Sequence, residues 1–378
     1  MRRFVLLVAG LAWLSFGALL LASVVVASSG GATQAQARWV IRDLGTLGGK
    51  ESEPVDINSR GQIVGWAVPK GSGFNHPFLW ENGRMRDLGT FGGRAGSALA
   101  VNDNGQVVGS AETRSGDGHA FLWENGKLRD LGTLGGAESE ASAINERGQV
   151  IGWAEDKSGE KRSFLWQDGT MRDLKAFAAS AINDLGQIVG TTSKGLALWQ
   201  NGKIRTLAKL GGDYYWAEAL NEHGQIIANT ALDVPGDDPV RAFIWQRGKL
   251  VSLGMLPRMN SIQGAAINER GEVIGESSGI RGASHGFLWY AGQLHDLGSN
   301  AIPSAINDDG QVVGDIYGLT ATDVGTTRGY IWQNGRATGL GTIGKLDSSA
   351  MDLNARGQVI GTVGEWGRNQ HAVLWTKR

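Results

Sequence analysis

The sequence predicts an all-β protein built from eight copies of one unit of about 43 residues. Two anchors establish this repeat. A tryptophan that ends an apolar triplet recurs at intervals of 43, 43, 33, 46, 44, 43 and 43 residues, at Trp80, Trp123, Trp166, Trp199, Trp245, Trp289, Trp332 and Trp375. An asparagine that opens an Asn-x-x-Gly turn recurs equally often, at Asn58, Asn102, Asn145, Asn183, Asn221, Asn268, Asn307 and Asn354.

The unit at residues 119–152 shows the predicted strands most fully. In the order of the fold, strand a is residues 141–145 and strand b is residues 149–152, joined by a turn with Asn first and Gly last. Strand c is residues 121–123, and an Asn-Gly pair joins it to strand d at residues 127–131. Asn-Gly between β-formers is a strong hairpin signal. Tight hairpins predict four-stranded antiparallel sheets, which favours propeller blades over a parallel β-helix.

Residue size supports sheets that radiate from an axis. Strand a carries small residues two and four positions before the turn asparagine, as in Ala98 and Ala100 or Ala141 and Ala143. Strand c is apolar at consecutive positions, as expected of a strand covered on both faces. Blades converge at the axis and splay outward, so the gap between them should widen from alanine-sized to tryptophan-sized. We therefore expect an eight-bladed β-propeller.

The two ends of the repeat region predict how the ring closes. Residues 39–44 match strand d although no strand a precedes them, and residues 372–375 are a strand c with no strand d after it. The N-terminal strand should complete the last blade and hide two edges that would otherwise stay open. We expect one propeller domain over residues 38–378.

Residues 1–37 resemble a secretory signal peptide. Arg2 and Arg3 precede an apolar run at residues 4–27, and Ala35-Gln36-Ala37 fits a cleavage site. The run is also long enough to span a bilayer, so an uncleaved membrane anchor is the alternative. Either interpretation predicts export, to the cell envelope or the extracellular space, and membrane contact only through an uncleaved anchor.

Composition excludes several functional classes. The chain has no cysteine, and hence no disulfide, thiol nucleophile or thiolate metal site. Residues 1–37 contain two arginines and no acid, so without them the formal charge changes from −1 to −3. This charge provides no electrostatic attraction for nucleic acid. We expect a monomer without a cofactor.

Loop variability indicates which face binds a partner. The a–b turns and c–d hairpins are short and uniform, whereas the b–c loops vary in length and chemistry. The b–c loops share a face with the d–a crossings, here called the b–c/d–a face, and function tends to lie on variable loops over a rigid frame. The candidate ligand residues on it are Tyr214, Tyr215 and Trp216, assigned to the crossing before blade five, with Asp237 and Asp238 in a long b–c loop. A core position is the competing interpretation of Trp216.

A basic residue precedes the apolar triplet in seven units, at His76, His119, Arg162, Arg241, His285, Arg328 and His371. Neighbouring sheets stand ~10 Å apart, whereas two nitrogens bound to one zinc ion must lie within about 4 Å. The spacing therefore disfavours a metal site, and we expect each basic side chain to bond a carbonyl or carboxylate at the blade edge. Asp56 and Asp352 replace the small residues of strand a in blades one and eight. We expect them to form separate hydrogen bonds, with a shared proton or cation as the alternative.

The chain resembles the HAF-repeat proteins, predicted extracellular proteins of bacteria whose tag is His-Ala-Phe before Leu-Trp. The full tag stands at residues 119–121, with near copies beginning at His76, His285 and His371. The sequence Asp-Leu-Gly-Thr-Leu-Gly-Gly at residues 43–49 and 130–136 is equally typical. The resemblance implies secretion and repeats and assigns no catalytic residues.

These observations predict a non-catalytic binding scaffold that recognises an extracellular glycan or protein through the b–c/d–a face. The sequence contains none of the common hydrolase, zinc-protease or phosphate-loop motifs. The alternative is a secreted propeller enzyme with an axial active site, either a carbohydrate-active hydrolase or lyase or a quinone-dependent dehydrogenase. Propellers host many unrelated functions, so the fold does not decide between the two.

Overall fold

The structure, a computed structural model, describes residues 38–212, 214–232, 239–279, 284–318, 327–344, 346–365 and 368–378. Every regular element within these ranges is a β-strand. The ranges contain no helix long and apolar enough to cross a membrane. Residues 1–37, where the signal peptide or anchor is predicted, lie outside them.

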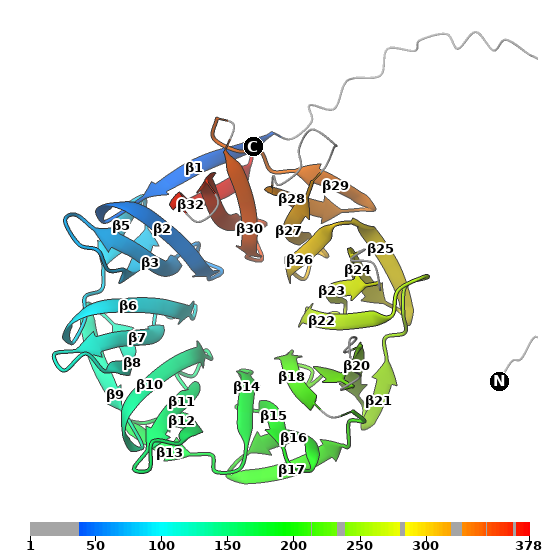
Figure 1. Cartoon of the computed structure of the whole chain (residues 1–378), viewed down its shortest axis with the longest axis horizontal. Helices are drawn as coiled ribbons and strands as arrows, with labels where there is room; N and C mark the ends of the chain where they lie inside the picture. The colour runs from blue at the N-terminus through cyan, green and yellow to red at the C-terminus, as the bar shows by residue number, and fades with distance from the viewer. Residues whose placement is uncertain are drawn as a thin grey trace, which may run out of the picture. The chain divides into compact units, whose positions relative to one another are not determined.

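The strands form eight four-stranded antiparallel sheets arranged in a ring (Figure 1). Blade one contains β2 (Gly48–Ile57), β3 (Ile63–Pro69), β4 (His76–Glu81) and β5 (Arg84–Asp87). Blade two contains β6 (Gly92–Val101), β7 (Val107–Thr113), β8 (Gly118–Glu124) and β9 (Lys127–Gly132). Blade three contains β10 (Gly135–Ile144), β11 (Val150–Asp156), β12 (Lys161–Gln167) and β13 (Thr170–Asp173). Blade four contains β14 (Ala178–Ile182), β15 (Ile188–Thr192), β16 (Gly195–Gln200) and β17 (Lys203–Ala208).

Blades five to eight continue around the ring. Blade five contains β18 (Tyr214–Leu220), β19 (Ile226–Ala231), β20 (Val240–Gln246) and β21 (Lys249–Ser252). Blade six contains β22 (Ser261–Ile267), β23 (Val273–Ser278), β24 (Ser284–Tyr290) and β25 (Gln293–Ser299). Blade seven contains β26 (Ala301–Ile306), β27 (Val312–Tyr317), β28 (Thr327–Gln333) and β29 (Arg336–Gly339). Blade eight contains β30 (Asp347–Leu353), β31 (Val359–Glu365) and β32 (Arg368–Lys377), together with β1 (Trp39–Gly45).

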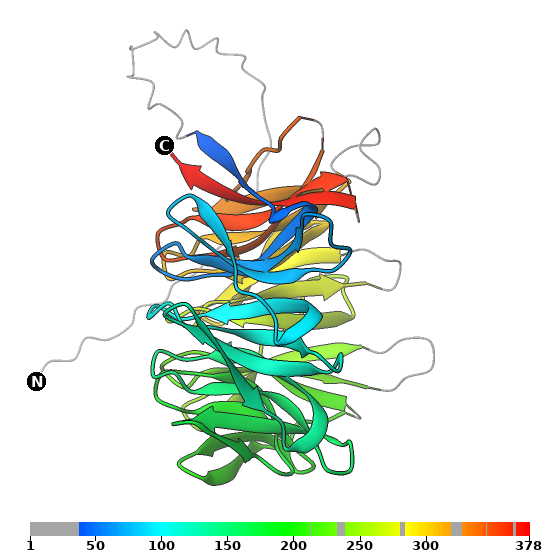
Figure 2. The ribbon, with the colours of Figure 1, turned by 90° about the vertical axis from the view of Figure 1, so that its left-hand side faces the viewer.

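The two ends of the propeller meet in blade eight, as predicted. Strand β1 pairs antiparallel with β32, and Trp39, Ile41 and Asp43 lie opposite Lys377, Trp375 and Val373. The eight-bladed ring with an N-terminal closing strand is therefore confirmed. Strand a of each blade lies nearest the axis and strand d lies at the rim (Figure 1). Seen from the side, the blades form a single layer (Figure 2).

The local turns follow the sequence signals. In the c–d hairpin of blade two, Asn125 and Gly126 both have positive φ, of 51° and 81°. This conformation belongs to the type I′ turn, whose twist matches that of the strands. In the a–b turn of blade one, the Gly61 amide donates to the Asn58 carbonyl at 3.0 Å.

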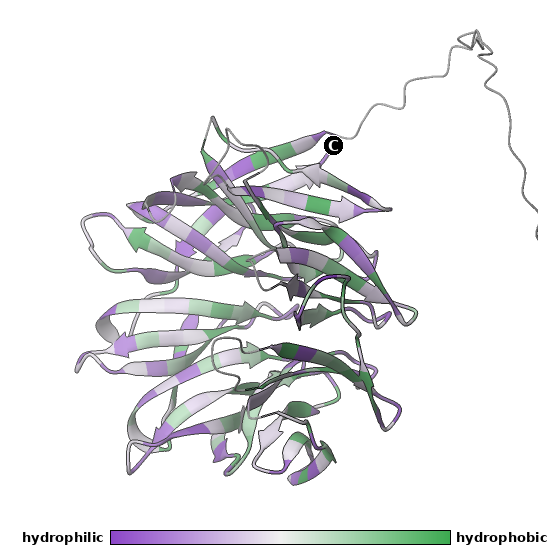
Figure 3. Ribbon diagram, turned by 45° about the vertical axis from the view of Figure 1, so that its right-hand side comes forward, coloured by the Kyte–Doolittle hydropathy of each residue, from purple (hydrophilic) through white to green (hydrophobic). Residues whose placement is uncertain are grey.

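The core lies between the blades. Phe78 and Trp80 of blade one pack with Ile360 and Leu374 of blade eight. Figure 3 shows hydrophobic positions, coloured green, along the strands. Five of the repeat tryptophans are buried: Trp80, Trp123, Trp166, Trp289 and Trp375. The other three are half-buried: Trp199, Trp245 and Trp332. Ala98 and Ala141 of strand a are fully buried, which agrees with the predicted gradient of residue size toward the axis.

The turn asparagines also form a ring of hydrogen bonds that the repeat pattern did not reveal. The Asn58 side-chain amide donates to the Asn102 carbonyl in the next blade at 2.9 Å, and the relation continues until Asn354 donates to the Asn58 carbonyl at 3.0 Å. All eight asparagines are buried. A buried amide left without partners costs ~1–3 kcal/mol, so each asparagine joins neighbouring blades as well as shaping its own turn.

Candidate functional site

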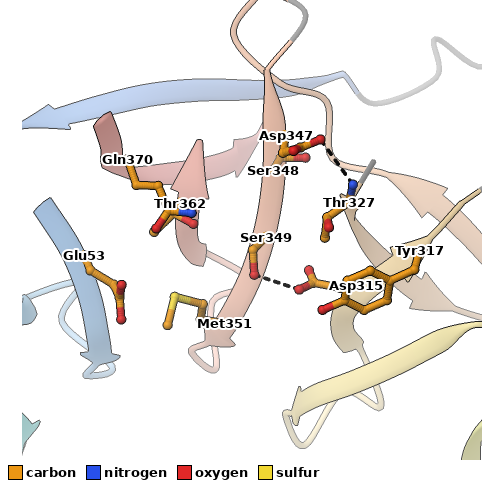
Figure 4. Close-up of a pocket in the computed structure, with 10 residues that line it drawn as sticks. All are labelled: Glu53, Asp315, Tyr317, Thr327, Asp347, Ser348, Ser349, Met351, Thr362 and Gln370. Atoms are coloured by element: carbon orange, nitrogen blue, oxygen red, sulfur yellow. Dashed lines mark hydrogen bonds between the residues drawn. The ribbon is translucent and has the colours of Figure 1, made fainter. Parts of the chain in front are cut away.

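A cavity of about 270 Å³ opens on the b–c/d–a face where blades seven, eight and one meet (Figure 4). Strand β30 runs through its centre and is flanked by β27 on one side and β2 on the other. The lining side chains are mostly polar: Glu53, Asp315, Tyr317, Thr327, Asp347, Ser348, Ser349, Met351, Thr362 and Gln370. We refer to this cavity as the polar pocket.

Asp315 joins blade seven to blade eight within the polar pocket. Its carboxylate accepts a hydrogen bond from the Ser349 hydroxyl at 2.7 Å and another from the Ala350 amide at 2.9 Å. Burial raises the pKa of Asp315, and these two hydrogen bonds oppose the increase. The Asp315 carboxylate is therefore partly desolvated, and its hydrogen-bond donors, Ser349 and the Ala350 amide, are both neutral.

Glu53 lies on the opposite side of β30, on strand β2 (Figure 4). Burial raises the pKa of its carboxyl, and a hydrogen bond from Trp66 lowers it. Trp66 lies directly opposite Glu53 in the β2–β3 pairing. The indole leaves the carboxyl with acceptor capacity that a bound ligand could use.

Asp347 is neutralised by a neighbouring cation. Its Oδ1 accepts from the Arg328 guanidinium at 3.0 Å and from the Thr327 amide at 3.2 Å. The Thr327 contact is drawn in Figure 4. Arg328 is the basic residue that precedes the apolar triplet in blade seven. It was expected to bond a carboxylate at the blade edge, and here that carboxylate, Asp347, lines the polar pocket.

The residue type at the position of Asp315 differs from blade to blade. This position is the fourth residue of strand b, directly after a glycine or alanine. Its eight residues are Trp66, Ser110, Trp153, Thr191, Asn229, Glu276, Asp315 and Thr362. Asn229 makes the same contact as Asp315, since it bonds the backbone of Gly264 in the next blade through both its amide and its carbonyl. Variation at one position of an otherwise regular repeat is the sequence signal that could have found this site, and our prediction did not use it.

The predicted aromatic run lies elsewhere on the ring, in blade five. Tyr214, Tyr215 and Trp216 form the start of strand β18, so their assignment to the crossing before this blade was wrong. Tyr214 is 64% exposed. The Tyr215 hydroxyl donates to the Thr192 carbonyl at 2.8 Å, and the half-buried Trp216 donates its indole N–H to Glu218 at 2.6 Å.

Tyr215 lines a second hollow, of about 630 Å³, together with Lys194, Lys209 and Leu210. The polar pocket contains none of the three aromatic residues. Asp237 and Asp238 lie outside the described residues. The structure therefore separates the predicted aromatic group from the pocket that has the denser set of polar groups.

The tag histidines make the expected kind of hydrogen bond. Nδ1 of each lies 2.9 Å from an aspartate of strand d, in the pairs His76–Asp87, His119–Asp130, His285–Asp296 and His371–Asp43. The last pair joins the C-terminal strand to the N-terminal strand. Within the described residues, no group of three or more histidines and acids could hold a metal ion.

Asp56 and Asp352 make the separate hydrogen bonds that were expected, and they also interact with each other. Each accepts from the backbone, Asp56 from the Val101 amide at 2.7 Å and Asp352 from the Leu353 amide at 2.8 Å. Burial raises both pKa values, and the neighbouring charge of Asp56 raises that of Asp352 further, well above the usual range. Two adjacent desolvated carboxylates repel each other, which favours a proton retained on the pair.

Solved structures confirm the fold. The chain is similar to a *Pyrococcus horikoshii* acylaminoacyl peptidase, with 11% identity and a TM-score of 0.50, over 85% of this chain and 59% of that one. It is also similar to a *Mycobacterium tuberculosis* puromycin-hydrolyzing peptidase, with 11% identity and a TM-score of 0.51, over 89% of this chain and 54% of that one. The chain thus spans little more than half the length of either peptidase. Similarity at this identity shows a shared fold only.

Fold and site together define the chain as an eight-bladed β-propeller with a polar pocket on its b–c/d–a face. None of the curated proteins matches it. Residues 90–278, half of the chain, match the family DUF3466, which is described as protein of unknown function. The chain belongs to this family.

Proposed function

We propose that this protein is an exported, non-catalytic binding propeller that recognises a glycan or a protein through its b–c/d–a face. The polar pocket is the observation that carries this proposal. Ligand sites are concave and use a few placed polar groups to orient what they bind. The pocket lies on the face whose loops vary, and a rigid frame of hydrogen-bonded blades holds its walls.

The hydrogen bonds of the acids favour binding over catalysis. Hydrolysis of a glycosidic bond by the usual mechanism needs two carboxyl groups free to act on the substrate. Asp315 is engaged by Ser349 and the Ala350 amide, and Asp347 by Arg328. Of the three acids, Glu53 has the most hydrogen-bonding capacity left for a substrate. One free carboxyl group is not enough for a mechanism that needs two.

The second candidate is a carbohydrate-active hydrolase or lyase. One observation favours it: Glu53 and Asp315 line one pocket, and burial raises the pKa of both carboxyls. A raised pKa is the property that a general acid needs near neutral pH. Turnover of chromogenic glycosides or release of unsaturated sugars, abolished by Glu53→Gln, would establish this function. No feature of the pocket favours the quinone-dependent dehydrogenase.

We propose a secreted or envelope location for the propeller, and a monomeric state. The signal-like residues 1–37 and the resemblance to HAF-repeat proteins support export, and membrane attachment enters only if the N-terminal segment is retained. The pairing of β1 with β32 supports a monomer, because the fourth strand of blade eight comes from the same chain and no strand of a second copy is needed to complete it.

The aromatic group of blade five is proposed as a further contact on the same protein. Tyr214 has the exposure that a stacking contact requires, and Tyr215 and Trp216 lie beside it in β18. Asp237 and Asp238 complete this set as hydrogen-bonding groups. Alanine substitution of the three aromatic residues should weaken a ligand that spans both regions and leave a ligand confined to the polar pocket unaffected.

The first prediction tests the polar pocket. Tyr317 is 40% exposed in its wall. We expect Tyr317→Ala to weaken binding of a ligand found on glycan and secreted-protein arrays by about tenfold or more, because exposed aromatic side chains contribute strongly to recognition. Affinity would be measured by titration calorimetry with the purified protein.

The matched control is Tyr290→Ala. Tyr290 is 39% exposed and lies at the c–d hairpin of blade six, on the opposite face. The Tyr290→Ala variant should bind the ligand with the same affinity as the parent protein. Equal losses from the two variants would contradict the proposed face, and no loss from Tyr317→Ala with any array ligand would contradict the pocket.

A further inference from the structure

The charges that line the polar pocket indicate what kind of ligand it accepts. Its ten lining residues include three carboxylates and no lysine, arginine or histidine. Arg328 neutralises Asp347 by its contact at 3.0 Å. Glu53 and Asp315 are held instead by neutral donors, Trp66 for one and Ser349 with the Ala350 amide for the other. The pocket therefore presents two acids whose charge the protein leaves without a cation.

Such a pocket rejects anions and gains from a positive charge. Two carboxylates in a partly desolvated cavity raise the free energy of a bound anion, whereas an ammonium group recovers the lost solvation through charge-assisted hydrogen bonds. The volume of about 270 Å³ is near the lower limit of small-molecule sites, so it suits one compact group and not a folded segment. Tyr317 adds an exposed aromatic ring, over which an ammonium is also favoured.

An unsatisfied buried hydroxyl also lies near Asp315, although it is not among the residues that line the polar pocket. Tyr330 of β28 stands where most blades carry phenylalanine, and it is 1% exposed. Within the described residues its hydroxyl has no hydrogen-bond partner. Asp315 lies close enough that its charge, after burial, raises the Tyr330 pKa. Buried polar groups are normally satisfied, so the Tyr330 hydroxyl retains hydrogen-bonding capacity that the protein does not use.

The rest of the lining distinguishes between sources of an ammonium group. Hydroxyl and amide groups of Thr327, Ser348, Ser349, Thr362 and Gln370 surround the acids. They match a ligand with several hydroxyl groups better than the methylene chain of a lysine. We propose that the polar pocket binds a glycan bearing free amino sugars, with ammonium groups beside Glu53 and Asp315 and the sugar hydroxyls on the surrounding polar side chains. This inference rests on the proposed function, since it assumes that the pocket is the binding site.

The test compares sugars with and without free amino groups, and a peptide that also carries an amino group. The purified protein would be titrated with a β-1,4-linked glucosamine tetramer, its fully N-acetylated counterpart, and a lysine-containing tetrapeptide. We expect binding of the glucosamine tetramer, at least tenfold weaker binding of the acetylated form, and no preference for the peptide. Affinity should increase with pH as Glu53 and Asp315 ionise, over the range in which the amino groups remain protonated.

Variants assign the effect to the pocket. Glu53→Gln should weaken glucosamine binding by about tenfold or more and leave the acetylated probe unaffected, because the amide keeps the shape and removes the charge. Glu124→Gln, at an exposed c–d hairpin on the opposite face, is the matched control. Thermal unfolding of both variants would verify that they are folded.

The outcomes separate the two proposals. Equal binding of the charged and acetylated sugars, or preferential binding of the peptide, would overturn the amino-sugar inference. If a neutral or anionic array ligand binds and Tyr317→Ala abolishes its binding, the proposed function stands and the inference fails. If no probe or array ligand depends on Tyr317 or Glu53, both fail.

Discussion

The carboxyl pair of Asp56 and Asp352 illustrates how one substitution in a repeat can change the chemistry of an interface. Six blades carry alanine at this position of strand a, and blades eight and one carry aspartate. Both residues are half-buried overall, and burial is the largest cause of the increase in both pKa values. We therefore expect the pair to retain a proton at a pH where exposed aspartates have lost theirs.

This pair predicts an unusual dependence of stability on pH. In the unfolded chain both groups ionise near pH ~3.9. The raised folded-state pKa of Asp352 means that its stabilising contribution is fully present below that value and is lost as pH increases through the folded pKa. We expect the free energy of unfolding to decrease by at most ~1.4 kcal/mol per pH unit for the retained proton. Denaturant unfolding at a series of pH values measures this slope.

Asp352→Asn is the informative variant. The asparagine amide can donate to Asp56 at every pH, so the decrease assigned to the pair should disappear and the variant should be more stable than the parent at neutral pH. Asp308→Asn, at an exposed position of an a–b turn, serves as the control and should keep the parent slope. Parallel curves for the parent protein and Asp352→Asn would contradict a shared proton.

Within a blade, the third residue of strand b shows how closely strands a and b approach. A Cβ atom added at Gly109 would lie 2.0 Å from the Ser97 carbonyl oxygen in the facing strand. The same approach recurs at Gly65, Gly152 and Gly275, with distances of 2.1, 2.0 and 2.0 Å to the facing carbonyl. In these four blades the close approach of the two backbones favours glycine, and an unusual φ is not the reason; blade five has Ala228 at this position.

We predict that Gly109→Ala destabilises the protein by about 1–3 kcal/mol, because the methyl group forces strands β6 and β7 apart. Gly118→Ala is the matched control, since nothing lies within 4 Å of its added Cβ and its φ is not in the positive region. The midpoint of urea unfolding compares the two. A control variant as unstable as Gly109→Ala would show that the loss does not arise from the close approach.

Around the whole molecule, two features hold the ring closed. The asparagine bonds link all eight blades on the a–b side, from Asn58 to Asn354 and back. Strand β1 completes blade eight from the other end of the chain, and His371 bonds Asp43 across that pairing at 2.9 Å. Closure therefore combines backbone pairing with side-chain contacts that no single blade could make.

Deletion of the seven-residue strand β1 should lower the stability of the protein strongly. It exposes one edge of β32, uncovers the buried Trp375 and removes the packing of Ile41 and Leu44. We expect a large decrease in the melting temperature and concentration-dependent association through the open edge, measured by calorimetry and light scattering. Arg42→Ala, which removes only the contact of its guanidinium with the Trp80 ring at 5.2 Å, should have a small effect. A monomeric, stable deletion variant would show that the ring does not need this strand.

Much of the architecture could be read from residue patterns, because its determinants are local. Asn-Gly pairs specify hairpins, small residues specify the converging strands, and the misplaced strand d at residues 39–44 predicts closure. The site was predicted less well. Tyr214 to Trp216 were recognised as unusual but assigned to a crossing, since three consecutive aromatic residues resemble an exposed loop as much as the start of a strand.

The polar pocket was missed for a physical reason. Glu53 lies 262 residues before Asp315, and Gln370 lies 55 residues after it, so only the closed ring brings the three side chains into one pocket. Likewise, the positions of Asp56 and Asp352 suggested proximity, but whether they share a proton depends on the orientation of two side chains at the closed seam.

The repeat pattern was sufficient to establish the number of blades, their strand order and the way the ends join, because each depends on backbone propensities and on the sizes of neighbouring side chains. The composition of the pocket, the carboxyl pair and the asparagine ring came only from the folded ring. They depend on which side chains of different blades meet across an interface, and that is decided by the angle and spacing of packed sheets, which no local stretch of sequence encodes.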